Sequence, residues 1–281
     1  MKKILNKKNI LIVIIFLFGM LLLSMMFHFF KYSETEWLKH FDNLDGLQKI
    51  NKFSFWWYIS TYELFGAIIF IYPILLILIS CYSFFEIYRS GFFQNIILIS
   101  GYKKTFVFEL LKAWKCSLIL PLISIISFIL SSLFYPNSKI LSYVETDGYP
   151  FQLVNDFMEV MNPYLFMILY FILLILFGLT VINIGFCFVK IFKKFYLVVI
   201  SSFVCFVFLE NINNLLIAPI VAKLTNIPKM MNGFSLYNLY YLNSSPSFWW
   251  EFIFAMLLFS VSTFVVLLIY SKREKVILDY E

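Results

Sequence analysis

Six long apolar stretches alternate with polar segments along the chain. They occupy about residues 10–30, 62–85, 116–135, 163–189, 195–217 and 249–270. Each is apolar on all sides and about as long as the roughly 20 residues that an α-helix needs to cross a bilayer. A transmembrane β-barrel would instead show shorter segments of alternating polarity. The pattern predicts an all-α integral membrane protein with six transmembrane helices in one domain, residues 1–281.

The composition agrees with this class. The chain is 62% hydrophobic and only 14% charged, with a mean hydropathy of +0.88, which excludes an ordinary soluble domain. The net charge of +6 does not indicate a nucleic-acid partner, because the Lys and Arg residues lie in the segments that join the spans.

The distribution of Lys and Arg predicts the orientation. Of the 22 Lys and Arg residues, 15 fall in the two terminal segments, residues 86–115 and the short turn after residue 189. Because cytoplasmic segments are enriched in these residues, we expect both termini inside, in a bacterial cytoplasmic membrane. The first apolar run is too long for a signal peptide and lacks a cleavage site, so we expect it to be retained as a span.

Three segments are predicted to lie outside: residues 31–61, 136–162 and 218–248. The first holds Trp56 and two other tryptophans that suit the membrane interface. The second contains an apolar stripe at helical spacing, typical of a surface helix. The third is too broken by Pro and Gly to span the membrane, and we expect it to form re-entrant or interfacial helices in the outer leaflet. The stripe in the second segment comprises Phe151, Val154, Phe157, Met158 and Met161.

The predicted cytoplasmic loop, residues 86–115, has a pattern of its own. It is basic, and apolar residues recur in its middle at helical spacing while Gln94 and Asn95 take the opposite side. A Gly ends the pattern and two lysines follow. This predicts a short amphipathic helix that lies on the membrane surface or contacts a cytoplasmic partner. The apolar positions are Phe92, Phe93, Ile96 and Ile97, the Gly is Gly101, and the lysines are Lys103 and Lys104.

This loop resembles the cytoplasmic loop of ABC-2-type transporter permeases. In that family a Glu near the end of one span precedes a Gly, a short helix with paired aliphatic residues, a turn, a basic residue and a Lys that opens the next span. The corresponding positions here are Glu86, Gly91, Ile96-Ile97-Leu98, Ser100-Gly101, Lys103 or Lys104, and Lys112, and Arg89 lies among them. The predicted span count, orientation and re-entrant segment are also similar to the family.

The resemblance implies a permease subunit that lacks ATP chemistry of its own. Its partners would be a separate ABC ATP-binding subunit, which carries ATP and Mg²⁺, a second permease chain and membrane lipid. The pathway would form between two permease chains, and the 36 Phe residues favour a hydrophobic or amphipathic cargo such as a peptide or a lipid-like molecule. Codon usage explains the Phe content equally well. The alternative is a non-transporting immunity or sensory protein that binds a peptide or lipid.

No sequence motif for catalysis is present. The segment Gly101-Tyr102-Lys103-Lys104-Thr105 lacks the glycine spacing of a P-loop. The four Cys residues lie in or beside apolar runs at spacings that fit neither a disulfide framework nor a zinc site. We therefore expect no enzyme activity, no metal and no cofactor on this chain.

A carboxylate occurs inside the fifth apolar stretch. Glu210 is followed by Asn211 and Asn214. One interpretation is that these residues line a polar pathway or anchor the re-entrant segment, since ionisable residues within spans face protein or water. The other is that Glu210 lies near the outer interface and is hydrated. The sequence does not decide between them.

Overall fold

The computed structural model describes residues 2–33, 52–53, 56, 64–90, 101–134, 144–146, 149–151, 162–212, 215, 219–220, 223 and 248–271. The helices are α1 (Lys2–Ser33), α4 (Leu64–Arg89), α6 (Tyr102–Trp114), the 3₁₀ helix η2 (Lys115–Leu118), α7 (Ile119–Phe134), α9 (Pro163–Ile191), α10 (Phe195–Ile212) and α12 (Phe248–Ile269). A small antiparallel hairpin joins β1 (Val144–Thr146) to β2 (Tyr149–Phe151).

The all-α prediction is confirmed for the described part of the chain, where the hairpin is the one exception. Among the described residues, four helices are long and apolar enough to cross a membrane: Ile71–Arg89, Tyr102–Phe134, Tyr164–Ile191 and Phe252–Ile269. Two shorter apolar helices, Ile10–Met26 and Phe195–Leu209, add to them. This is the architecture of a multi-pass membrane protein.

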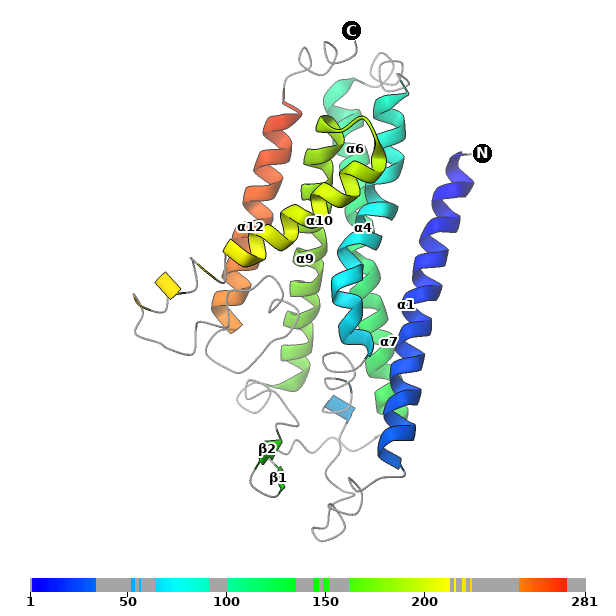
Figure 1. Cartoon of the computed structure of the whole chain (residues 1–281), viewed down its shortest axis with the longest axis vertical. Coiled ribbons are helices and arrows are strands. Elements are labelled where there is room, and N and C mark those ends of the chain that lie inside the picture. Colours follow the sequence, from blue (N-terminus) through cyan, green and yellow to red (C-terminus); the bar gives the residue numbers. More distant parts are fainter. Residues whose placement is uncertain are drawn as a thin grey trace.

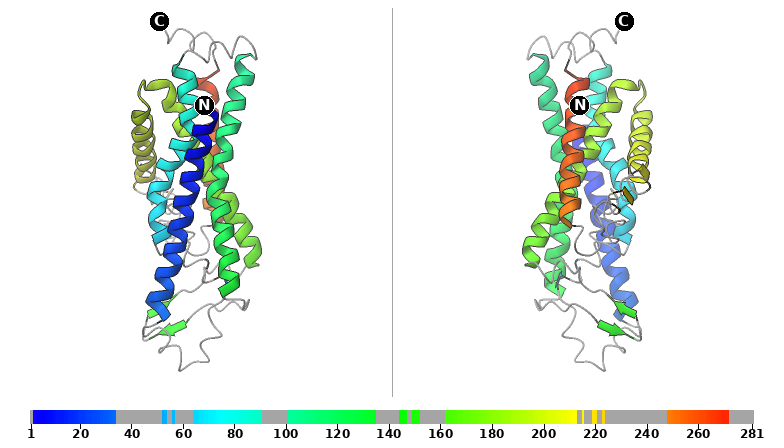
Figure 2. Two further views of the ribbon diagram at one scale, coloured as in Figure 1. Left: turned by 90° about the vertical axis from the view of Figure 1, so that its right-hand side faces the viewer. Right: turned by 90° about the vertical axis from the view of Figure 1, so that its left-hand side faces the viewer.

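Helix α9 is the centre of the bundle. It packs against α12, α4, α10, η2 and α7, while α1 lies against α4 and α7 (Figure 1). Two turned views show that α10 runs beside the bundle over only part of its height (Figure 2). The last residue of α4, the first of α6, the α9–α10 turn and the last residue of α12 all lie at the end of the bundle that is uppermost in Figure 1. We call it the basic end, because Arg89, Lys103, Lys104, Lys190, Lys193 and Lys194 lie there.

The third apolar helix begins earlier than the sequence indicates. Helices α6, η2 and α7 follow one another without a break, so that residues 102–115 of the predicted loop are helical. The lysines in this part suggested a loop, but Lys112 is accommodated by contacts with neighbouring side chains. Pro121 explains the local 3₁₀ geometry, because it has no N–H to donate to the carbonyl of Ser117 and its ring crowds that carbonyl.

Two features that the sequence analysis places outside the membrane fall largely outside the described residues: the surface helix in 136–162 and the re-entrant segment 218–248. Phe151, expected in a surface helix, instead ends β2. The dipeptide Asp147-Gly148 between the two strands is one that favours a two-residue hairpin loop, which accounts for the difference. The rest of the predicted stripe and most of residues 218–248 are not described. Trp56, expected at the interface, is fully buried and donates from Nε1 to the carbonyl oxygen of Ser124 at 3.1 Å.

Two glycines allow α9 to approach its neighbours closely. A Cβ atom built on Gly185 would lie 2.6 Å from Sγ of Cys81 on α4, and one on Gly178 would lie 2.8 Å from Cβ of Ser117 in η2. Both distances are far below normal van der Waals contact. Small residues at such positions let membrane helices gain dispersion contacts along their length. These contacts matter because the hydrophobic effect does not drive helices together within lipid.

We expect Gly185→Ala to destabilise the bundle and Cys81→Ala to reverse most of that loss. The added methyl group collides with a sulfur atom, and removal of the sulfur makes room for it. Overpacking of this kind costs about 1–3 kcal/mol. The measurement is the free energy of unfolding in mixed detergent micelles.

Gly19 provides the matched control, since a Cβ atom built there meets nothing within 4 Å. Gly19→Ala should leave stability unchanged or raise it slightly, because it favours the helix. Equal losses from Gly19→Ala and Gly185→Ala, or no recovery in the double variant, would contradict the close approach of α4 and α9.

Candidate functional site

Arg89 joins the end of α4 to the end of α9. Its Nη2 atom donates to three carbonyl oxygens, those of Val189 at 3.3 Å, Lys190 at 3.0 Å and Phe192 at 2.8 Å. Carbonyl groups at the end of a helix lack partners within the helix, and a cation there also interacts favourably with the helix dipole. The guanidinium group therefore fixes the α9–α10 turn to the end of α4.

Glu86 lies one turn before Arg89 on the same helix. Its carboxylate accepts a hydrogen bond from the hydroxyl of Tyr82 at 2.6 Å. The ring of Tyr82 packs edge-on against Phe195, the first residue of α10, with ring centres 5.0 Å apart. Glu86 thus orients an aromatic contact between α4 and α10, and it does so at the same end of the bundle as Arg89.

Gly101 and the residues after it begin α6. Gly101 has a φ of 80°, in the left-handed region that favours glycine, and its carbonyl oxygen accepts from Oγ1 of Thr105 at 2.9 Å. Lys103 and Lys104 are exposed in the first turn of α6, which contains no acidic residue. Since cations are unfavourable at a helix N-terminus, these lysines do not stabilise the helix that carries them.

The next residue, Tyr102, fixes α6 to α12. Its hydroxyl donates to the carbonyl oxygen of Tyr270 at 2.8 Å, and the hydroxyl of Tyr270 donates to the carbonyl oxygen of Phe186 on α9 at 2.9 Å. The rings of Phe106 and Tyr270 stack beneath these bonds with centres 4.5 Å apart. The residues on both sides of segment 91–100 are therefore anchored in the bundle, Arg89 to α9 and Tyr102 to α12.

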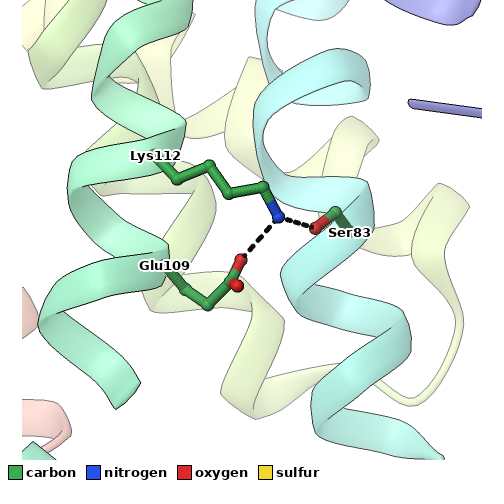
Figure 3. A network of polar contacts seen from close by, with 3 residues as sticks. All are labelled: Ser83, Glu109 and Lys112. Atoms are coloured by element: carbon green, nitrogen blue, oxygen red, sulfur yellow. Dashed lines mark hydrogen bonds and ion pairs between the residues drawn. The ribbon is translucent and has the colours of Figure 1, made fainter. Parts of the chain in front are cut away.

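The predicted amphipathic segment itself lies outside the described residues. This covers Gly91, Phe92, Phe93, Ile96 and Ile97. Lys112, which the sequence analysis places at the start of the third span, lies inside α6. Its Nζ atom contacts Oε2 of Glu109 at 3.1 Å and Oγ of Ser83 on α4 at 3.0 Å (Figure 3).

The role of Glu210, Asn211 and Asn214, which are distant in the sequence from the residues of the basic end, stays a prediction. Glu210 and Asn211 lie in the last turn of α10, but their side chains are not among those described, and Asn214 lies outside the described residues. The choice between a pathway role and a hydrated interface remains as the sequence leaves it.

A polar cluster in the bundle interior was not predicted. The side-chain amide of Asn183 on α9 is fully buried, and its Nδ2 atom donates to Oγ of Ser262 at 3.1 Å and Oγ1 of Thr263 at 2.9 Å on α12. Its Oδ1 atom accepts from Nε1 of Trp114 on α6 at 2.9 Å. Every hydrogen of this amide group is used, so the cluster connects three helices rather than offering groups to a ligand. A lone Asn in an apolar run is the only signal that the sequence gives for it.

Within the described residues, no group of three or more His, Cys, Asp or Glu side chains is arranged to hold a metal ion. No family model matches the chain, and neither the curated proteins nor the solved structures contain a match. The arrangement at the basic end is therefore the main evidence for function.

We expect Arg89→Met to lower the free energy of unfolding by about 1–3 kcal/mol, since hydrogen bonds from a charged donor contribute about that much and these three are partly buried. Arg89→Lys should recover only part of the loss, because the lysine side chain is one bond shorter and its ammonium group falls short of the position that Nη2 occupies. Chemical denaturation in detergent is the measurement.

Lys103→Met is the control, because it removes an exposed cation at the same end of the bundle and should change stability by less than about 0.5 kcal/mol. If Arg89→Met and Lys103→Met lower the free energy of unfolding by equally small amounts, Arg89 does not hold the α9–α10 turn.

Proposed function

We propose that this chain is the membrane subunit of an ATP-driven exporter of the ABC-2 permease type, in a bacterial cytoplasmic membrane. Two such chains form the pathway, and a separate ATP-binding subunit that carries ATP and Mg²⁺ drives it. Segment 91–100 contacts that subunit through its apolar side. The cargo is a hydrophobic or amphipathic peptide or a lipid-like molecule.

One observation carries this proposal. An amphipathic sequence of ten residues separates two long apolar helices at the basic end, and the residues that flank it are held by specific bonds. A force applied to this segment would reach α9 through Arg89 and α12 through Tyr102. A loop that only covers the membrane surface would not need such anchors.

The orientation is part of the proposal. The start of α1, which is rich in Lys, the end of α4, the α9–α10 turn and the end of α12 lie toward one end of the bundle (Figures 1 and 2). In the sequence, Lys272, Arg273 and Lys275 follow α12. With α1 and α10 counted as spans, six helices cross the membrane, and the positive-inside rule places both termini in the cytoplasm. Helix α10 has 18 residues, or about 27 Å along its own axis at 1.5 Å per residue. It lies oblique to the other helices in Figure 1, so its role as a span is part of the proposal.

Labelling of single cysteines from outside intact cells tests the orientation, with the four native Cys replaced by Ala. Ser138→Cys should react with a membrane-impermeant thiol reagent, and Ser90→Cys should react only after the cells are opened. The reverse pattern would exclude the proposed orientation.

Copurification tests the partner. Phe93→Asp and Ile97→Asp should detach the proposed ATP-binding subunit when the two are expressed together, since a groove that receives these side chains would have to desolvate a carboxylate, at a cost of several kcal/mol. Lys103→Ala and Lys104→Ala should weaken binding only slightly, because exposed ion pairs contribute about 0–1 kcal/mol.

Gln94→Asp is the matched control, because it adds the same charge on the polar side of the predicted helix. It should keep the subunit bound, and all variants should insert normally. If Phe93→Asp and Ile97→Asp retain the ATP-binding subunit as well as Gln94→Asp does, segment 91–100 is not the contact, and a non-transporting membrane protein becomes the better account.

A further inference from the structure

Helix α6 has two distinct faces. Tyr102, Thr105, Phe106, Leu110 and Ala113 are buried against the bundle. The outward face, continued into η2, alternates lysines with large apolar side chains, and all of them are exposed. It comprises Lys103, Lys104, Val107, Phe108, Leu111, Lys112, Lys115 and Leu118. We call this surface the α6 cationic face.

The position of this face along the bundle is fixed by α12. Tyr102 is bonded to the carbonyl oxygen of Tyr270, and Trp114 packs edge-on against Phe259 with ring centres 5.6 Å apart. The whole of α6 therefore lies beside the last part of α12. That part carries no charged residue, and it exposes Val261, Phe264, Val265, Leu267 and Leu268.

Lysines on α6 thus lie at the same depth as apolar side chains of α12 that suit lipid. Lys115 is 13 positions beyond Tyr102, or about 20 Å along the helix axis at 1.5 Å per residue. A cation at that depth is unfavourable unless an anion or water reaches it. Lys112 has such a partner in Glu109 (Figure 3). Within the described part of the chain, Lys103, Lys104 and Lys115 have no ion-pair partner.

We propose that the α6 cationic face binds anionic phospholipid, with phosphate groups drawn toward Lys104 and, deeper in the bilayer, toward Lys115, and acyl chains along Phe108, Leu111 and Leu118. Cα–Cβ bonds in a helix tilt toward its N-terminus, so these lysines extend toward the basic end and the headgroup region. Long stems let the ammonium groups reach further in that direction while the stems stay in apolar surroundings. The bilayer is thinned locally at this face, which is how membranes accommodate such cations.

The charge of the face favours an anionic lipid over a zwitterionic one. Lys103, Lys104 and Lys115 bring three positive charges that no carboxylate of the described residues balances, whereas a zwitterionic headgroup brings its own cation close to them. Each Lys near an anionic membrane surface strengthens association about fivefold, which corresponds to about 1 kcal/mol. This site is independent of the proposed transport function.

Native mass spectrometry of the full chain tests the proposal, with phosphatidylglycerol or phosphatidylcholine added in detergent. The parent protein should retain phosphatidylglycerol and not phosphatidylcholine. Lys115→Gln should bind phosphatidylglycerol about fivefold more weakly, and Lys104→Gln combined with Lys115→Gln more weakly still. Lys115→Arg should bind like the parent. Excess inorganic phosphate should leave the bound lipid in place.

Lys223→Gln is the matched control, because Lys223 is exposed and lies on another segment of the chain. It should bind phosphatidylglycerol like the parent. The proposal is overturned if Lys115→Gln retains as much phosphatidylglycerol as the parent, if Lys223→Gln loses as much as Lys115→Gln, or if both lipids bind equally well.

Discussion

The buried amide of Asn183 sets the constraint on which the bundle depends. In apolar surroundings an amide whose hydrogen bonds are unmet is strongly unfavourable, and lipid supplies no substitute partners. Asn183 meets this demand with Trp114 on α6 and with Ser262 and Thr263 on α12. A shift of any of the three helices along its axis by one turn would break at least one of these bonds. The amide therefore fixes the relative depth of α6, α9 and α12.

Close packing and carbonyl capping extend this register to the basic end. Gly178 and Gly185 bring η2 and α4 against α9, and Arg89 then reaches the carbonyl groups at the end of α9. The hydroxyl of Tyr102 likewise donates to the carbonyl oxygen of Tyr270, which joins the start of α6 to the end of α12. Because the helices are fixed relative to one another in the interior, the flanks of segment 91–100 have defined positions. The proposed partner contact and the lipid-binding face both follow from that arrangement.

The sequence predicted the apolar helices well where charge marks their ends. The fourth was expected over residues 163–189 and is Pro163–Ile191, and the sixth was expected over 249–270 and is Phe248–Ile269. The early start of α6 was not predictable, because Lys112 becomes compatible with a packed helix only through Glu109 and Ser83. Arg89 and Gly101 were selected as candidate residues, but the three carbonyl partners of Arg89 come from distant sequence. Asn183 was missed because its partners are brought together only by folding.

A double-mutant cycle between Trp114 and Asn183 tests this account most directly. Trp114→Phe removes the indole donor, Asn183→Ala removes the acceptor, and unfolding free energies of the parent, both single variants and the double variant give the coupling energy. Interhelical hydrogen bonds in membranes couple by about 0.6–2 kcal/mol. The account predicts a coupling energy in that range, with the double variant less destabilised than the sum of the single variants. Strictly additive losses would show that Asn183 does not hold α6 in register with α9.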